Sequence, residues 1–443
     1  MTGSINLKEL RLEESGGSSR LLFEYSLNGK DDQIYFEVDK KYGSYLCHEN
    51  ADAFVMLFLP GAMKQGMDIV SSVPVSEDLL YNLRLYLIPS IARYNPELYC
   101  TAVKAPAAPM CGESAPGIGI SFSGGVDSFY AVLKHINSGL MKDRPVYFFT
   151  NDVSGLGRFN REQKEHNFRI MKAIADELGF PQVVAWSNAF QKVNPLEHHA
   201  RAHNFTSSFA IFCLQKLWGI HLYSSGGYRL NMANIDCTFK VFPGKFRDEN
   251  FLHQFMSTKA LKVYCAGTEA TRVDKLRYIA DFPIVQKHLT VCLNNPVHCS
   301  VCDKCMMTIL GLDVVGKLDK FSGLFDVNYY RKNRPRYLQY MYKRAVRAKD
   351  PFFVELYDCL SGTLPENEHD YYMKIAREWM PPYVWTRPYP LRYKGKIRRL
   401  ILGGFDMELY WRFKRKPKGI MKNKGYNLKK LLMAAHKAGR VTE

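Results

Sequence analysis

One stretch, residues 117–128, limits what this chain can fold into more than any other. It begins with a short apolar run typical of a buried strand and turns at the adjacent glycines Gly124 and Gly125. It then continues into apolar residues at helical spacing that end at Gly139. The pattern predicts a strand, a glycine-rich loop and a helix. Such a loop brings backbone N–H groups close to a phosphate, and the helix N-terminus adds positive potential.

The polar side chains of this loop fit an anion site. Ser123 and Ser128 supply hydroxyl donors, and Asp127 supplies a carboxylate that suits a metal ion bridging phosphates. The loop is not a Walker loop, because no lysine follows the two glycines. The alternative interpretation is a tight strand–helix turn that binds no ligand. We predict a nucleotide site, because the sequence Ser-Gly-Gly-Val-Asp-Ser directly follows a predicted strand.

Length and composition limit the remaining possibilities. A chain of 443 residues is expected to hold two or three domains. The first residues lack the apolar segment of a signal peptide, and no apolar run reaches the length of a membrane span. Most of the eleven cysteines are isolated, which favours a reducing, cytoplasmic location. The net charge is +18, but residues 320–443 hold 28 Lys/Arg and 11 Asp/Glu, so the basic character belongs to the C-terminal region.

Residues 1–112 are predicted to form a small N-terminal α+β domain without evident chemistry. Alternating apolar residues on both sides of Asn28 and Gly29 predict a hairpin. Residues 54–59 are predicted to be a buried strand, and Ser76 is predicted to begin a helix with acidic residues in its first turn.

Residues 113–318 are predicted to form a doubly wound α/β domain. Four short apolar runs alternate with helical patterns between residues 117 and 224, which is typical of a parallel sheet with right-handed crossovers. In such sheets, ligands lie at the carboxyl ends of the strands. The segments that follow the strands should therefore surround one site; they are residues 123–128, 151–157, 187–188 and 225–228.

Four cysteines lie close together in the sequence and predict a metal site. Cys292, Cys299, Cys302 and Cys305 have the spacing C-x6-C-x2-C-x2-C, which allows their thiolates to converge on one tetrahedral ion. Cys302 and Cys305 are predicted to lie at the start of a helix. Four thiolates favour structural zinc, an iron–sulfur cluster is the alternative, and His298 is not expected to be a ligand.

Together, the loop and the cysteine cluster resemble the ATP pyrophosphatases of the PP-loop superfamily, and within it the 7-cyano-7-deazaguanine synthase branch. The resemblance covers about residues 117–318. It implies an adenine nucleotide alpha hydrolase-like fold. It also implies that ATP is cleaved between its α and β phosphates, leaving AMP on a substrate oxygen that a nitrogen nucleophile then displaces. The implied cofactors are ATP, Mg²⁺ and structural Zn²⁺.

The loop pattern and the resemblance assign roles to individual residues. The residues implied in catalysis are Asp127, Ser128 and Lys275. Those implied in ATP binding are Ser121, Ser123, Gly124, Gly125, Val126, Asp127, Ser128, Asn151, Asp152, Gly226 and Arg272. Those implied to face the substrate are Arg201, Asn204 and Asp236. The chain departs from the family on the substrate side, since it lacks the Pro-Gly before the Arg-Asn pair and has Asn234-Ile235 in place of Tyr-Pro.

Residues 319–443 are predicted to form a basic, mainly helical C-terminal region. Its charges alternate with rings such as Tyr337, Tyr340 and Tyr342, a mixture that suits RNA, an acidic protein partner or, less well, a membrane surface. The predicted function is ATP-dependent adenylation of a small carboxylate or amide. One alternative is a tRNA-thiolating enzyme that binds RNA through this region and carries sulfur on Cys237 or Cys265. The other is a non-enzymatic nucleotide sensor; the oligomeric state is not predicted.

Overall fold

The computed structural model describes residues 3–108, 114–153, 160–224, 249–292, 298–347 and 350–377. The chain divides into two compact units. The first consists of Met1–Val291 together with Asp319–Leu324, and the second consists of Cys292–Leu318 together with Phe325–Glu443. This division differs from the predicted one, which places boundaries after residues 112 and 318.

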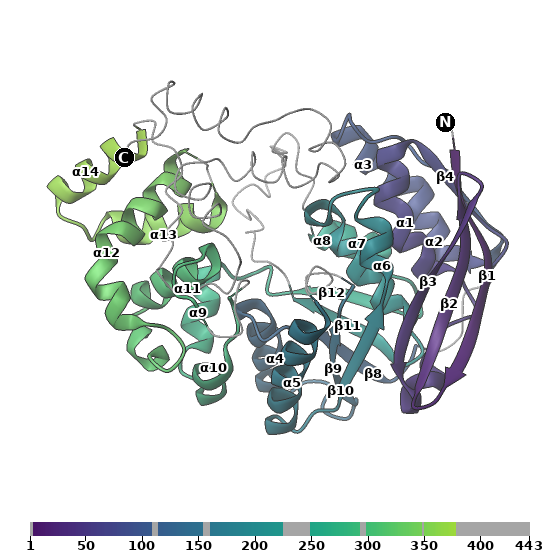
Figure 1. The fold of residues 1–443 in the computed structure, drawn as a ribbon, viewed down its shortest axis with the longest axis horizontal. Helices are drawn as coiled ribbons and strands as arrows, with labels where there is room; N and C mark the ends of the chain where they lie inside the picture. Colours follow the sequence, from purple (N-terminus) through teal and green to yellow (C-terminus); the bar gives the residue numbers. More distant parts are fainter. Residues whose placement is uncertain are drawn as a thin grey trace, which may run out of the picture. The chain divides into compact units, whose positions relative to one another are not determined.

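A ten-stranded sheet forms the centre of the first unit, in the order β12-β11-β8-β9-β10-β3-β2-β1-β4-β6 (Figure 1). Five neighbouring strands of it are parallel to one another: β8 (Gly117–Ser121), β9 (Val146–Asn151), β10 (Gln182–Ser187), β11 (Trp218–Ser224) and β12 (Lys262–Ala266). The predicted α/β class with a large, mostly parallel sheet is therefore confirmed.

Helices lie between these strands or follow the last of them in the sequence, and they cover both faces of the sheet. They are α4 (Val126–Ser138), α5 (Arg161–Glu177), α6 (Ala189–Val193), α7 (His199–Cys213), α8 (Glu249–Met256), α9 (Arg272–Ile279) and α10 (Pro283–His288). The chain adds β9 and β10 on one side of β8, then returns to add β11 and β12 on the other side. Because of this reversal, α4 and α5 cover one face of the sheet and α7 covers the opposite face (Figure 1).

The N-terminal strands extend the same sheet. The predicted hairpin is confirmed: β2 (Ser18–Leu27) and β3 (Lys30–Asp39) pair antiparallel, and the turn residues Asn28 and Gly29 both have positive φ, as a type I′ turn requires. The other N-terminal strands of this sheet are β1 (Gly3–Ser15), β4 (Met67–Ser71) and β6 (Val103–Lys104). The short strands β5 (Val75–Ser76) and β7 (Ala107–Ala108) form a separate two-stranded sheet. β3 pairs antiparallel with β10, which joins these strands to the parallel part.

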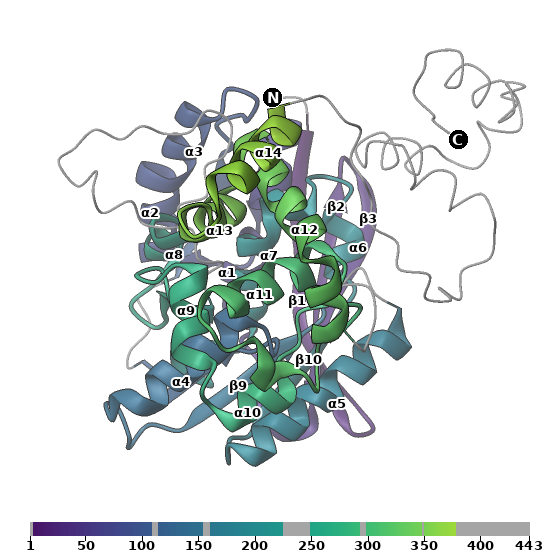
Figure 2. The same ribbon diagram turned by 90° about the vertical axis from the view of Figure 1, so that its left-hand side faces the viewer.

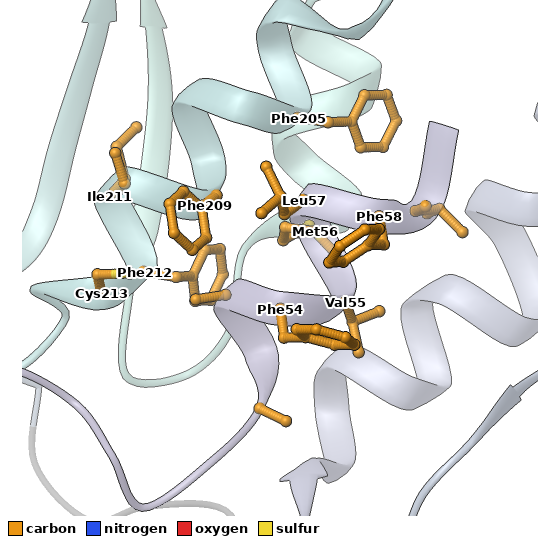
Figure 3. Close-up of a cluster of buried hydrophobic side chains, with 14 of the residues drawn as sticks. Phe54, Val55, Met56, Leu57, Phe58, Phe205, Phe209, Ile211, Phe212 and Cys213 are labelled. Atoms are coloured by element: carbon orange, nitrogen blue, oxygen red, sulfur yellow. The ribbon is translucent and has the colours of Figure 1, made fainter. Parts of the chain in front are cut away.

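The predicted strand at residues 54–59 is wrong, because these residues lie in α1 (Asp52–Gln65). Almost every residue of α1 is buried, and α1 lies beside α7 with Met56 and Leu57 between the two helices (Figure 3). Phe54 and Phe58 contact each other at 4.7 Å, and both contact Tyr25 of β2. A helix that is buried all round has no apolar stripe, so a short apolar run within it cannot be distinguished from a buried strand. The predicted helix start at Ser76 is confirmed by α2 (Glu77–Asn82), which continues through η2 (Leu83–Leu87) into α3 (Ile88–Tyr94).

One hydrophobic core serves both the N-terminal strands and the helices of the parallel sheet. The ring of Phe209 on α7 lies 5.6 Å from that of Phe23 on β2 and 5.7 Å from that of Phe36 on β3. Phe23 in turn stacks on Phe54 of α1 at 6.2 Å. Residues 1–112 therefore belong to the same compact unit as the parallel sheet, which explains the difference from the predicted domain boundary.

The described part of the second unit is helical (Figure 2). It contains α11 (Asp303–Val314), α12 (Val327–Tyr342), η5 (Lys343–Arg347), α13 (Pro351–Ser361) and α14 (Glu366–Arg377). Tyr337 and Tyr342, which the sequence suggested as rings for RNA bases, are buried in its core. The Tyr337 hydroxyl donates to the Ser300 carbonyl at 2.6 Å. Among the described residues, no helix has the length and apolar character needed to cross a membrane.

Candidate functional site

The predicted strand–loop–helix is present, and it lies where the strand order reverses. β8 runs between β9 and β11, so the loop after it opens at the switch point of the sheet, where α/β proteins bind ligands. Two backbone hydrogen bonds hold the loop: Phe122 N donates to Phe149 O at 2.9 Å, and Thr290 N donates to Gly124 O at 2.8 Å. Gly124 has a φ of +68°, in the left-handed region that glycine adopts without strain.

The N-terminus of α4 faces this loop with its backbone N–H groups uncapped by any described side chain. Its N-cap residue is Gly125, and Val126 is its first residue. The buried Ser128 hydroxyl donates to Gly125 O at 3.0 Å and lies 3.4 Å from the exposed Ser123 hydroxyl. Because the first N–H groups of a helix have no partner within the helix, this end suits a phosphate.

Three predicted site residues meet beside this helix end. The Asp127 carboxylate lies 3.0 Å from Lys275 Nζ and 3.0 Å from an Arg272 terminal nitrogen. Lys275 is fully buried, the Arg272 side chain is 7% exposed, and that of Asp127 is 20% exposed. Two buried cationic side chains thus lie together beside the helix N-terminus. Positive potential of this kind favours an anionic ligand.

Both cations come from α9, and the sequence fixes where that helix starts. Thr271 caps it by accepting a hydrogen bond from Asp274 N at 3.2 Å, and the Asp274 carboxylate accepts from Thr271 N at 3.1 Å. This capping box places Arg272 and Lys275 one turn apart on the same face. The Tyr130 ring of α4 lies 5.7 Å from Lys275 Nζ. The predicted site residues Asp127, Arg272 and Lys275 thus lie together in the structure.

Asn151 and Asp152 follow β9, as predicted, but Asp152 is engaged in a structural role. Its carboxylate lies 2.9 Å from Lys164 Nζ and accepts a hydrogen bond from Ser187 N at 2.8 Å. Burial raises the pKa of Asp152, and the Lys164 ammonium opposes that rise. Asp152 therefore ties the end of β9 to the end of β10. The Asn151 side chain accepts a hydrogen bond from Val153 N at 3.2 Å.

The strand on the other side of β8 contributes a histidine that sequence reasoning missed. His221 Nε2 lies 2.9 Å from the Ser121 hydroxyl, and the Ser224 hydroxyl donates to Ser121 O at 2.9 Å. Burial lowers the pKa of His221 to about 3, so the ring is neutral. A histidine inside an otherwise apolar predicted strand was the available signal, because a buried polar group usually has a hydrogen-bond partner.

The predicted substrate residues are only partly covered. Asn204 lies on α7 and is buried, with 3% of its surface exposed. Gly226 and Asp236 lie outside the described residues, and so does the side chain of Arg201. Of the predicted site segments, 151–157 is described only as far as residue 153, and 225–228 lies outside the described residues. The structure therefore brings together Ser121, Ser123, Ser128 and the Asp127 group.

The four predicted cysteine ligands converge in the second unit. One sulfur atom from each of Cys292, Cys299, Cys302 and Cys305 lies within 4.8 Å of all the others. The Sγ of Cys292 is 3.6 Å from that of Cys299, and the Sγ of Cys299 is 4.0 Å from that of Cys305. Zinc–sulfur bonds of about 2.3 Å place tetrahedral sulfur atoms about 3.8 Å apart. The cluster therefore has the dimensions needed to hold a metal ion such as zinc.

The surroundings of the cluster also fit a bound cation. Cys302 is the N-cap of α11, and its backbone N–H donates to the Cys299 sulfur at 3.3 Å. Hydrogen bonds from the other three thiols lower the pKa of Cys292, whereas hydrogen bonds to Cys292 and Cys299 raise that of Cys302. Four sulfur atoms this close cannot all ionise without a cation among them. His298 packs on Phe325 at 4.6 Å and is not one of the four convergent ligands.

Comparison with protein-family models, with curated proteins and with solved structures gives no match to this chain. The function must therefore be argued from the residues and their arrangement.

Proposed function

We propose that this protein is an ATP-dependent adenylating enzyme that forms AMP and pyrophosphate. The observation that carries the proposal is the meeting of Asp127, Arg272 and Lys275 at the uncapped N-terminus of α4. This group lies at the switch point of a parallel sheet, where nucleotides bind in related architectures. The Ser-Gly-Gly-Val-Asp-Ser loop, which resembles that of the PP-loop ATP pyrophosphatases, lies at the same place.

Each group has a distinct task in this proposal. The backbone N–H groups at Gly124 and Gly125 and the Ser123 hydroxyl bind phosphate oxygens. Arg272 and Lys275, already desolvated against Asp127, turn part of their charge to the triphosphate. Bound Mg²⁺, held by Asp127, would neutralise charge on the phosphates. Positioned cations and donors act with greatest effect where water is excluded, so little covalent chemistry is required of the protein.

The proposed reaction has two steps. A carboxylate or amide oxygen of a small substrate attacks the α-phosphorus, and pyrophosphate leaves. A nitrogen nucleophile then displaces AMP from the activated carbon. These two reaction steps match those of the 7-cyano-7-deazaguanine synthase branch, which the loop and the cysteine cluster resemble. The cysteine cluster, with its four thiolates and no open position, serves a structural role and holds zinc.

The test is pyrophosphate release from ATP in a screen of small carboxylates, amides and bulk tRNA. We expect Asp127→Asn to lower the rate by at least about 100-fold. Because the substitution leaves Lys275 and Arg272 buried without their carboxylate, it should also lower the free energy of unfolding by about 3 kcal/mol. Rates are therefore compared at a temperature where urea unfolding curves show both proteins folded.

A second variant and a control keep this test independent of folding. Ser123→Ala changes an exposed hydroxyl and should slow release by about 10-fold with little loss of stability. Asp176→Asn, in an exposed i,i+4 pair with Lys172, should change neither quantity. Normal release in Asp127→Asn would exclude the proposed site. ATP binding without release across the whole screen would favour the nucleotide sensor.

A further inference from the structure

The hydrogen bond between His221 and Ser121 joins a buried ring to the start of the proposed nucleotide loop. His221 Nε2 lies 2.9 Å from the Ser121 hydroxyl, and His221 is fully buried. Ser121 is the last residue of β8 and is partly exposed at the carboxyl edge of the sheet. An apolar side chain would fill the place of His221 if packing were its only purpose, because burying a polar group is costly.

The sheet has a slot that admits this ring. His221 pairs with Gly119 in the register of β11 and β8, and a Cβ at residue 119 would lie 2.4 Å from His221 Nδ1. Non-bonded carbon and nitrogen atoms do not approach this closely, so only glycine leaves room for the imidazole. The ring centroids of Trp218 and Phe149 lie 5.0 and 5.8 Å from that of His221. The ring therefore extends along β8 from residue 119 toward Ser121.

The slot also decides which ring nitrogen carries the proton. Burial lowers the pKa of His221 to about 3, so the ring is neutral and has a single N–H group. Among the described residues, none forms a hydrogen bond with Nδ1. The Gly119 C–H bond that takes the place of a side chain points at this nitrogen. A lone pair on Nδ1 tolerates the C–H group, whereas an N–H there would press against it and would be a buried donor without an acceptor. The proton therefore lies on Nε2.

The position of this proton fixes the role of the Ser121 hydroxyl. Because His221 donates through Nε2, the Ser121 oxygen accepts, and its own proton points away from the ring. In the described part of the chain, no group accepts a hydrogen bond from this hydroxyl. The opposite tautomer would turn the hydroxyl proton toward His221 and leave only an acceptor for a ligand. Ser121 is therefore a donor, and it suits a group that only accepts hydrogen bonds.

We propose that His221 is a positioning residue that directs the Ser121 hydroxyl proton to a phosphate oxygen of the bound nucleotide. Ionised phosphate oxygens only accept hydrogen bonds, and Ser121 directly precedes the loop whose N–H groups bind phosphate in the proposed function. This role rests on the proposed nucleotide site and adds a donor to it. His221 acts through Ser121 and does not touch the nucleotide itself.

Nitrogen NMR of the full-length, nucleotide-free protein with labelled histidine rings locates the proton. The His221 signals are assigned from their loss in His221→Gln. We expect a protonated Nε2 and an unprotonated Nδ1, with no change between about pH 5 and pH 8 because the ring stays neutral. A proton on Nδ1, or a ring that titrates in this range, would overturn the assignment. This measurement requires neither ATP nor enzymatic activity.

Calorimetry with Mg²⁺ and ATP, and separately with Mg²⁺ and pyrophosphate, measures the contribution of the hydroxyl. We expect Ser121→Ala to weaken binding of both probes about 10-fold, because one hydrogen bond to a charged group is lost. His221→Leu should also weaken binding, and the double variant should bind no more weakly than Ser121→Ala alone, since His221 acts through Ser121. His221→Gln, whose amide N–H can replace Nε2–H, should recover most of the affinity. Ser138→Ala removes an exposed hydroxyl at the other end of α4 and should bind like wild type.

Two binding results would overturn the proposed role of His221. Wild-type affinity in Ser121→Ala would remove this hydroxyl from the site, and additive losses in the double variant would show that His221 supports only the fold. The Ser121→Ala result does not depend on the folding of any variant at the buried His221. Normal pyrophosphate release from ATP together with wild-type affinity in Ser121→Ala would leave the proposed reaction intact. The expected affinities without release in the substrate screen would instead contradict the reaction alone, and no binding of either probe by the wild-type protein would contradict both.

Discussion

At the scale of single residues, buried charge separates groups that serve the fold from groups available to a ligand. Asp152 and Asp127 are both carboxylates that follow central strands, yet their surroundings differ. Asp152 is held by one lysine and one backbone N–H, a balanced arrangement that joins two strands. Asp127 lies beside two cations at the uncapped N-terminus of α4, and a fifth of its side chain is exposed. The position of the carboxylate, more than the residue type, distinguishes the two roles.

Asp52 offers a residue-scale prediction about pH. It is fully buried at the start of α1, where Ser76 donates to it through its backbone N–H at 2.8 Å and its hydroxyl at 2.6 Å. Burial raises the pKa of Asp52 to about 6. The unfolded chain therefore loses this proton at lower pH than the folded protein. The contribution of Asp52 to the free energy of unfolding should fall by up to about 3 kcal/mol as the pH rises from 4 to 6.

Asp52→Asn should remove this dependence, because the amide stays neutral and can still accept from Ser76 N. Urea unfolding at pH 4 to 7 should show the variant gaining stability relative to wild type as the pH rises. The difference between the two proteins isolates Asp52 from histidines that titrate in the same range, such as His221. Asp31→Asn, at an exposed pair with Lys8, is the control and should run parallel to wild type. Parallel curves for Asp52→Asn and wild type would contradict the raised pKa.

At the scale of elements, the loop between β8 and α4 depends on one backbone conformation. Gly124 has a φ of +68°, and a Cβ there would lie 2.7 Å from the end of the Met171 side chain. Gly139, at the other end of α4, has a φ of +66° and only the flexible Lys142 nearby. Substitution by alanine should cost about 1 kcal/mol of stability at either glycine. Only Gly124→Ala should also displace the N–H groups that bind phosphate.

We therefore expect Gly124→Ala to weaken ATP binding by at least about 10-fold and Gly139→Ala to leave it unchanged, as measured by calorimetry. The matched loss of stability in the two variants separates the effect on the loop from that on the fold. Equal ATP affinity in both variants would show that the loop backbone does not contact the nucleotide.

Elements also show which features the sequence could predict. Local patterns were sufficient for the strand, loop and helix at Gly124, and for the hairpin at Asn28 and Gly29. Residues 54–59 were predicted wrongly because their apolar environment comes from α7, about 150 residues away in the sequence. Asp127 was identified from the loop pattern, whereas Arg272 and Lys275 were identified from the resemblance alone. The contact between His253 on α8 and Tyr223 on β11 was not predicted, since the two residues are far apart in the sequence and only folding brings their ring centroids to 4.4 Å from each other.

At the scale of the whole molecule, the two compact units have different sources of stability. The first buries a large apolar core between its sheet and helices. The second places its cysteine cluster at the start of α11, and the Tyr337 hydroxyl of α12 donates to the carbonyl of Ser300, which lies between the ligands Cys299 and Cys302 in the sequence. Metal binding to four thiolates contributes directly to folding free energy, because the unfolded chain has no preformed site. Removal of the metal should therefore affect the second unit selectively.

Hydrogen exchange measured by mass spectrometry reports on each unit separately and so tests this expectation. Wild-type protein should contain about one zinc ion per chain, and a strong chelator or Cys302→Ser should remove it. Amides of α11 and α12 should then lose about 100-fold of their protection, equivalent to ~3 kcal/mol, while β8 and β9 keep theirs. Cys100→Ser, at an exposed cysteine of the first unit, is the matched control and should retain both metal and protection. Full metal content in Cys302→Ser would show that this cysteine is not a metal ligand. Bound iron together with visible absorption would show that the site holds an iron–sulfur cluster in place of zinc. Equal loss of protection in both units would mean that the metal stabilises the molecule as one cooperative body.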